Sequence, residues 1–384
     1  MNDHQAIDLL EELVRVPSVS REEGQAVELL VERMNQAGFR ASVDEAGNAV
    51  GRIGDEGPRV ALLGHIDTVP GYVPVGREDG RLYGRGAVDA KGCLAAFAAA
   101  AARAATSGEL ACRVELIACV EEEVASSRGA RYRATQPAPD ACIIGEPSGS
   151  GAVTVGYKGF LRARLTREED IAHTAAEAPG VAALACRQWT EIEDGANHFN
   201  GGRDALFDQL LLHLSKVDVQ SDGLRERAEL DVRLRLPPDL GPEAAVRWLA
   251  GRSPGWLLSE EGGLPAWSGP RTSPVARAVG RAISVAGNRA RYQRKTGTAD
   301  MNVVAPAWGC PCVAYGPGDS ALDHAPNEYL EIEELFRSIS VLEHVLGPSG
   351  LAPLLAPREG ARQDARQDPR EGVARPLSSG SSAD

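Results

Sequence analysis

The sequence lacks the long apolar stretch that a membrane-spanning helix needs, because no run approaches about 18 apolar residues. Residues 1–20 form a charged segment with helical spacing, and we therefore expect a helix there and not a signal peptide. Positive charge is in deficit, with 41 Lys and Arg against 54 Asp and Glu and a formal net charge of −13. This balance is unfavourable for nucleic acid or an anionic membrane as a partner. We therefore expect a cytoplasmic protein with neither of these partners.

A disulfide framework is also missing. The seven cysteines show no paired spacing, which fits a reducing compartment, and the Cys310-Pro311-Cys312 segment resembles neither a redox motif nor a closed zinc site. What the chain does have is length and an ordinary globular composition, with 384 residues of which 43% are hydrophobic. A chain of this length is long enough to form two domains, each with a substantial core.

Four short apolar runs each end near a side chain of a type that binds metal ions. The runs span residues 60–63, 114–120, 141–144 and 312–315. Runs this short and continuous are typical of parallel strands buried on both faces. The residues that follow them are His65 and Asp67, the triplet Glu121 to Glu123, Glu146, and Asp323 with His324. Because ligands gather beyond the carboxyl ends of strands in open α/β sheets, the pattern predicts one shared crevice and a metal-dependent hydrolase.

The spacing of apolar residues changes twice along the chain. Before residue 158 and after residue 268, helical segments alternate with short buried strands, whereas the stretch between has the alternating pattern of half-exposed antiparallel strands. We therefore predict an α/β fold, with a doubly wound, mostly parallel sheet domain made of residues 1–157 and 269–346. An α+β domain is inserted at residues 158–268. Residues 347–384, rich in Pro, Gly, Ser, Arg and Asp, are predicted to be a disordered tail.

Each candidate residue also has an ordinary structural interpretation. His65 and Asp67 are two apart, so an extended backbone points both to one face, where Asp67 would hold the second ring nitrogen of a metal-bound His65. A single pair of this kind is more often an ordinary strand-end histidine in a turn. Asp89, flanked by glycines before a predicted helix, is either an N-cap or a carboxylate that bridges two metals. An acidic triplet is usually a solvated face, but beside these residues one Glu would bind metal and its neighbour would act as base.

Five segments together resemble a known family. LLGHIDTVPG, GRGAVDAKG, VEEEV, IIGEPS and DHAPNEYL closely resemble, in order and spacing, the motifs of the two-zinc amidohydrolase and exopeptidase family. That family includes acetylornithine deacetylase, succinyl-diaminopimelate desuccinylase and carboxypeptidase G, and the resemblance spans roughly residues 5–346. It implies the fold of a metallopeptidase domain with a lid, and two divalent ions, Zn²⁺ or Co²⁺. The implied metal ligands are His65, Asp89 as the bridge, Glu123, Glu146 and His324.

The same resemblance implies catalytic roles. Asp67 would orient His65, and Glu122 would be the general base for water attacking an amide. The family usually has Asp-Glu-Glu where this chain has three Glu, so an offset of one residue in these roles stays open. Residues 170–175 resemble the family's lid segment, in which His173 would support the oxyanion; the alternative is a surface histidine on a loop.

A loop indicates the branch of the family. KTGTADMNVV, with Thr296, Gly297 and Thr298 as the expected substrate-binding residues, resembles the branch that releases lysine or ornithine from the terminal glutamate of a small, acidic amino-group carrier protein. Four cations within residues 289–295 would receive the carrier, unless they form an ordinary solvated edge. The resemblance also allows a homodimer through the inserted domain.

Other activities remain alternatives at this point. A small-molecule deacylase would act on N-acetylornithine or succinyl-diaminopimelate, and substrate preference separates it from a carrier hydrolase. A metal-free binding or scaffold protein of the same fold would lack bound metal altogether. A general dipeptidase has little but the fold in its favour.

Overall fold

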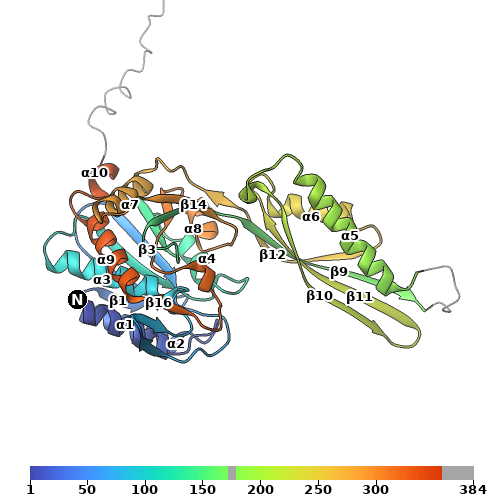
Figure 1. Cartoon of the computed structure of the whole chain (residues 1–384), viewed down its shortest axis with the longest axis horizontal. Helices are drawn as coiled ribbons and strands as arrows, with labels where there is room; N and C mark the ends of the chain where they lie inside the picture. Colours follow the sequence, from blue (N-terminus) through green and yellow to red (C-terminus); the bar gives the residue numbers. More distant parts are fainter. Residues whose placement is uncertain (172–178, 357–384) are drawn as a thin grey trace, which may run out of the picture.

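The computed structural model of the chain describes residues 1–171 and 179–356 (Figure 1). A larger body holds both ends of this part of the chain, and a smaller, elongated body projects from it. The chain crosses between the bodies near Lys158 and again near Pro265. Among the described residues, no helix has the length and apolarity that crossing a bilayer requires.

A nine-stranded mixed sheet forms the centre of the larger body. Its neighbouring strands are, in order, β1 (Arg40–Val43), β2 (Ala49–Ile53), β6 (Arg113–Cys119), β3 (Arg59–His65), β7 (Ala141–Gly145), β15 (Cys312–Ala314), β8 (Ala152–Tyr157) and β13 (Trp267–Ser268), while β14 (Arg291–Lys295) pairs with β8. The four strands from β6 to β15 are mutually parallel. These four strands contain the four apolar runs, so their carboxyl ends lie at one edge of the sheet.

Helices cover both faces of this sheet, which explains why its strands are apolar without alternation. One face packs against α1 (Asp3–Arg15), α2 (Gly24–Gln36), α3 (Lys91–Thr106), α7 (Pro274–Val285) and α9 (Ile332–Leu346), and the other against α4 (Arg128–Ala134) and α8 (Met301–Trp308). On β3, Leu62 belongs to the first core and Leu63 to the second. The helix α3 is almost wholly buried, and its alanines let it pack closely between the sheet and the outer helices α1 and α9. The predicted α/β fold class is confirmed.

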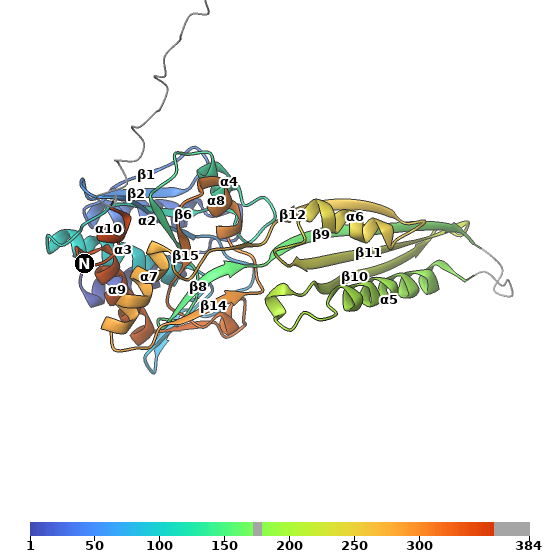
Figure 2. The ribbon, with the colours of Figure 1, turned by 90° about the horizontal axis from the view of Figure 1, so that it is seen from above.

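The smaller body is a four-stranded antiparallel sheet with two helices on one face (Figure 2). Its strands, in sheet order, are β10 (Leu211–Ser221), β11 (Arg225–Leu236), β9 (Gly159–Asp170) and β12 (Leu257–Leu264); its helices are α5 (Val181–Phe199) and α6 (Pro242–Gly251), with a short 3-10 turn at Leu206–Asp208. Along β11, Leu230, Val232 and Leu234 are buried beneath the helices, and the residues between them face away. The exact boundaries expected for the inserted domain stay a prediction.

A small three-stranded sheet joins two segments that are far apart in sequence. It consists of β4 (Gly76–Glu78), β5 (Arg81–Tyr83) and β16 (Tyr329–Glu331), and a 3-10 turn at Ser320–Leu322 precedes β16. Tyr329 pairs with Tyr83, and Leu330 with Leu82. This pairing places the segment that contains Asp89 beside the segment that contains His324.

The end of the folded part differs from the expectation. The disordered tail was predicted to begin at residue 347, but α10 (Ala352–Leu355) follows, Leu351 is fully buried, and the leucines of α10 pack against the main core. The composition of this stretch is typical of disorder, but three of its leucines bury apolar surface against the core. Residues 347–356 therefore belong to the structured chain. Residues 357–384 lie outside the described part.

Lys91 ties α3 to the N-terminal segment. Its side chain is 1% exposed, and its Nζ donates hydrogen bonds of 2.9 Å to the carbonyl oxygens of Leu13 and Val16. Burial lowers the pKa of Lys91 to about 7. The neutral amine can still donate both hydrogen bonds, so these contacts do not depend on its charge.

We predict that Lys91→Met lowers the free energy of unfolding by about 2–4 kcal/mol, because two buried carbonyl oxygens lose their donors. The midpoint of urea denaturation measures the effect. The matched control is Lys216→Met, which removes an exposed lysine whose ion pair is with Asp218 and should change stability by less than about 1 kcal/mol. A loss for Lys91→Met no larger than for the control would show that these hydrogen bonds contribute little.

Candidate metal centre and substrate pocket

His65 ends strand β3 and is 1% exposed. Its Nδ1 lies 3.0 Å from the backbone carbonyl oxygen of Asp67 and 3.5 Å from the Oδ1 atom of that residue. A proton held on Nδ1 by Asp67 leaves Nε2 free to bind a metal ion. The Asp67 carboxylate also accepts hydrogen bonds from the Ser20 hydroxyl at 2.7 Å and from the backbone N–H groups of Glu122 and Glu123 at 3.0 Å. Asp67 therefore positions the acidic triplet as well as His65, which the sequence did not reveal.

Asp89 lies between two histidines that come from opposite ends of the sequence. Its Oδ1 is 3.0 Å from Nε2 of His65, and its Oδ2 is 3.1 Å from Nε2 of His324. The same Nε2 of His324 lies 2.9 Å from Oε1 of Glu123. Ligand atoms of His65, Asp89 and Glu123 all lie within 4.8 Å of one another. One carboxylate thus presents one oxygen to each histidine, which is the arrangement that a bridging ligand requires.

The three glutamates of the triplet have different surroundings. Glu121 adopts a left-handed backbone conformation with φ of 60°, and its carboxylate pairs with Arg128 at 2.7 Å and accepts a hydrogen bond from Ser126 at 2.5 Å. Glu122 and Glu123 instead line the pocket that contains Asp89. The geometry therefore favours Glu122 and Glu123, and not Glu121, as the residues available for chemistry.

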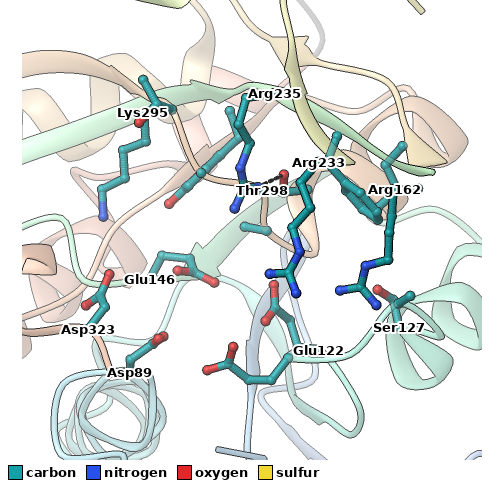
Figure 3. Close-up of a pocket in the computed structure, with 18 of the residues that line it drawn as sticks. Asp89, Glu122, Ser127, Glu146, Arg162, Arg233, Arg235, Lys295, Thr298 and Asp323 are labelled. Carbon is teal, nitrogen blue, oxygen red and sulfur yellow. Dashed lines mark hydrogen bonds between the residues drawn. The ribbon is translucent and has the colours of Figure 1, made fainter. Parts of the chain in front are cut away.

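The pocket lies between the two bodies and has a volume of about 540 Å³. Glu146, which follows β7, is 8% exposed and lines this pocket close to Asp89 and Asp323 (Figure 3). Asp323, which the sequence analysis noted only as the neighbour of His324, has a buried Oδ1 without a hydrogen-bond partner among the described residues. The structure thus brings the expected metal-binding residues to one pocket floor, at the carboxyl ends of the parallel strands.

Burial governs the ionisation of these side chains. It raises the pKa of Glu122 and Glu146 well above the ordinary carboxyl value, and it raises the pKa of Asp323 to about 8. Burial opposes the charge on His65, but hydrogen bonds to two carboxylates outweigh it, so the pKa of His65 is raised well above its ordinary value. Hydrogen bonds to the two histidines lower the pKa of Asp89 despite its burial. The carboxyl groups of the pocket floor therefore outnumber the positive charges that could stabilise their ionised forms.

The residues of the pocket floor fit divalent metal binding. Among the described residues, two histidines lie there with five carboxyl groups, those of Asp89, Glu122, Glu123, Glu146 and Asp323. Imidazole nitrogens and carboxylate oxygens are donors that suit Zn²⁺ and Co²⁺, and a divalent charge would offset the excess of negative charge. A metal-free scaffold would leave this excess buried without compensation, which makes that alternative physically unfavourable.

The opposite wall of the pocket is basic. Arg162 of β9 and Arg233 of β11 are cross-strand partners, and Arg235 lies two residues further along β11 on the same face (Figure 3). We call Arg162, Arg233 and Arg235 the basic wall. These three arginines were not predicted from the sequence, although the alternation in the segment Arg233-Leu234-Arg235-Leu236 indicates a basic sheet face.

The expected substrate loop also lines the pocket. Thr296, Gly297 and Thr298 all lie on its surface, and the hydroxyl of Thr298 accepts a hydrogen bond of 2.8 Å from Nη1 of Arg235. This contact links the loop to the basic wall. His173, expected to support the oxyanion, lies outside the described residues.

Comparison with known proteins places the chain in a family. The model of peptidase family M20/M25/M40 matches residues 61–347. The chain belongs to this family. A LysW-lysine hydrolase from Deinococcus radiodurans is 42% identical over 349 residues, which cover 89% of this chain and 96% of that protein. A protein from Thermococcus kodakarensis with the provisional name LysW-lysine/LysW-ornithine hydrolase is 39% identical and covers 90% of this chain and 92% of its own length.

Solved structures of M20 proteins share the fold. The M20 family metallo-carboxypeptidase from Sulfolobus solfataricus has a TM-score of 0.73 at 19% identity, with 90% of this chain and 99% of that chain covered. These comparisons confirm the family resemblance drawn from the motifs, and as a member of M20 the chain is a hydrolase.

We predict that metal binding to this M20 protein releases protons at pH 7. Two hydrogen-bonded carboxylates raise the pKa of His324 to about 10, and the pKa of His65 is raised as well, so both hold protons that a metal ion must displace. Titration calorimetry in buffers of different ionisation enthalpy should show release of at least one proton per chain. Because protons compete with the metal ion, affinity should rise from pH 6 to pH 9. A binding enthalpy that is independent of the buffer would contradict this linkage.

Proposed function

We propose that the chain is a dimetal amide hydrolase that releases lysine, with ornithine as a second candidate product, from the terminal glutamate of an acidic amino-group carrier protein. The observation that carries the proposal is the pocket itself, in which a bridging Asp89 lies opposite a basic wall. The relative that is 42% identical and named LysW-lysine hydrolase supports the substrate class. We further propose that the protein acts in the cytoplasm, in lysine or arginine biosynthesis.

The geometry suggests how two ions would be shared. His65, Oδ1 of Asp89 and Glu146 would hold one ion, and His324, Oδ2 of Asp89 and Glu123 would hold the other. Zn²⁺ or Co²⁺ bound there would polarise the scissile carbonyl and acidify water. Asp67 would keep the Nε2 atom of His65 turned toward its ion.

Glu122 is the proposed general base and acid. It belongs to the pocket lining but makes no contact with either histidine among the described residues, so its carboxyl is available for proton transfer. Burial raises the pKa of Glu122 well above the ordinary carboxyl value, which suits a group that must both accept and return a proton. It would take a proton from the attacking water and give it to the nitrogen of the leaving amine.

The basic wall is the proposed binding surface for substrate carboxylates. On the same two strands, Arg164 and Arg227 form ion pairs with Asp231 and Glu229, whereas the basic wall has no acidic partner within the described residues. Like charges directly across a strand pair destabilise a sheet, and a bound anion offsets that cost. The α-carboxylate of the released amino acid and the acidic residues of a carrier both have the matching chemistry.

The basic segment at residues 289–295 adds to this surface only in part. It forms β14 beside β8, and Arg294 and Lys295 line the pocket. Arg291 is exposed outside the pocket lining.

We also propose that the half-exposed sheet of the smaller body supports a homodimer, as the family resemblance implies.

A hydrolysis assay tests the proposed function. Metal-loaded protein is incubated with carrier protein bearing a terminal glutamyl-lysine, or with free N-acetylornithine, and the products are followed by mass spectrometry. We expect lysine release from the carrier, with kcat reduced about 1,000-fold in Glu122→Gln because proton transfer is lost. The matched control Glu121→Gln alters a neighbouring glutamate that faces Arg128, and it should stay within a few-fold of wild type.

Two outcomes would contradict the proposal. Preference for N-acetylornithine over the carrier would make this a small-molecule deacylase. That alternative has some support from a Mycobacterium tuberculosis relative, 28% identical, with the provisional name succinyl-diaminopimelate desuccinylase. Equal losses in Glu121→Gln and Glu122→Gln would remove the assignment of the base.

We predict that Arg233→Ala raises the KM for the carrier substrate about 10–100-fold, because a charged hydrogen bond to a carboxylate contributes about 1.5–3 kcal/mol. The salt dependence of kcat/KM should weaken in parallel. Arg227→Ala, on the same strand but paired with Glu229, is the control and should leave both quantities unchanged. A KM that is equal in the two variants would rule out the basic wall as the binding surface.

A further inference from the structure

Glu328 is a fully buried carboxylate that contacts the segment of the bridging residue without entering the pocket. Its exposed fraction is 0%, and it is absent from the pocket lining. Its Oε1 accepts hydrogen bonds from the backbone N–H groups of Val88 at 2.9 Å and Asp89 at 3.2 Å. Glu328 itself lies on the loop that follows His324. One side chain therefore fixes the backbone of Asp89 from the segment that supplies the partner histidine.

Arg85 makes the reciprocal connection. Its Nη1 donates to Oε2 of Glu328 at 2.7 Å, and its Nη2 lies 3.4 Å from the carbonyl oxygen of His324. Its Nε donates to the carbonyl oxygen of Gly71 at 3.3 Å. Arg85 precedes Asp89 in sequence, so each of the two segments contributes one side chain that binds the other.

The geometry at His324 depends on such support. His324 has a φ of 61°, a left-handed conformation that costs a non-glycine residue free energy and persists only where its surroundings impose it. Its side chain is about half exposed, so packing alone does not hold the ring against Asp89 and Glu123. The hydrogen bond from Arg85 acts on the backbone of His324 itself.

His65 does not need this support, because it has its own. Its ring is buried within β3 and is held by Asp67, which in turn is fixed by Ser20 and two backbone N–H groups. The two histidines of the metal centre are therefore positioned by different sets of residues, and Asp89 is the ligand that they share.

We propose that Glu328 and Arg85 form a positioning pair that sets the distance between Asp89 and His324. The pair thereby acts chiefly on the metal position formed by Asp89, Glu123 and His324, because Arg85 contacts the backbone of His324, and it reaches the position beside His65 only through the shared ligand Asp89. This inference rests on the proposed two-metal centre. Neither residue lines the pocket, so both would act through the ligands that they hold.

The test uses metal-free full-length protein titrated with Co²⁺, followed by calorimetry and by the visible absorption spectrum of the bound ion. Glu328→Gln keeps an oxygen for the two N–H groups but turns an amide toward Arg85, so the pairing is lost. We expect one of the two affinities to fall about 10–100-fold, with a changed spectrum for that ion, because residues that orient metal ligands have effects of this size. The other affinity should stay within a few-fold of wild type. At saturating metal, KM should not change.

The chain offers a matched control on the same small sheet. Glu331 pairs with Arg81 at 2.8 Å, but both side chains are about 40% exposed and neither residue lines the pocket. Glu331→Gln should leave both affinities and the spectrum unchanged. Arg85→Lys is a second test, since a lysine keeps the charge but cannot reach Glu328 and His324 together. It should weaken the same metal position and decides the question if Glu328→Gln fails to fold.

The remaining outcomes overturn the inference in distinguishable ways. Lower thermal stability with both affinities intact would make the pair purely structural. Equal weakening of both positions would remove the proposed selectivity. Binding of a single ion by the wild-type chain would instead overturn the two-metal centre itself, and with it the proposed mechanism.

Discussion

The structure depends on one buried carboxylate that is shared by two histidines. Asp89 presents an oxygen to His65 on one side and to His324 on the other, and its own segment follows two glycine-bounded turns. Several further acids crowd the same pocket floor, and burial would protonate them unless positive charge compensates. The surrounding structure can be understood as the means of holding these charges together: parallel strands deliver the side chains, and Asp67 and the positioning pair fix their backbones.

The pocket also shows why net charge predicts little about local recognition. The chain carries −13 overall, yet three arginines of the smaller body face the acidic floor without acidic partners of their own among the described residues. Divalent ions would bind at the pocket floor, and substrate carboxylates would bind at the basic wall. An acidic protein can thus accept an acidic partner, because exposed charges more than about 10 Å apart are largely screened from one another at ordinary salt concentrations.

Much of the architecture followed from sequence pattern. The four central strands and the alternating strands of the smaller body lie close to where apolar spacing placed them. Strands with weak patterns were missed. The segment of β14 has four charged or polar residues and reads as a basic surface, but backbone pairing with β8 makes it an edge strand. The leucines after residue 350 were hidden within a composition typical of disorder, and only their burial shows that they belong to the fold.

By itself, the sequence determined the fold class and the candidate ligands, because strand-end residues and motif order are local properties of the chain. Tertiary structure alone decided which neighbours cooperate. Glu121 was separated from Glu122 and Glu123 by a left-handed backbone and by its pairing with Arg128. The basic wall, and the contact of Glu328 with the segment of Asp89, depend on strand register and on pairings between residues far apart in sequence. Such distances arise from the packing of whole sheets, and no spacing along the chain encodes them directly.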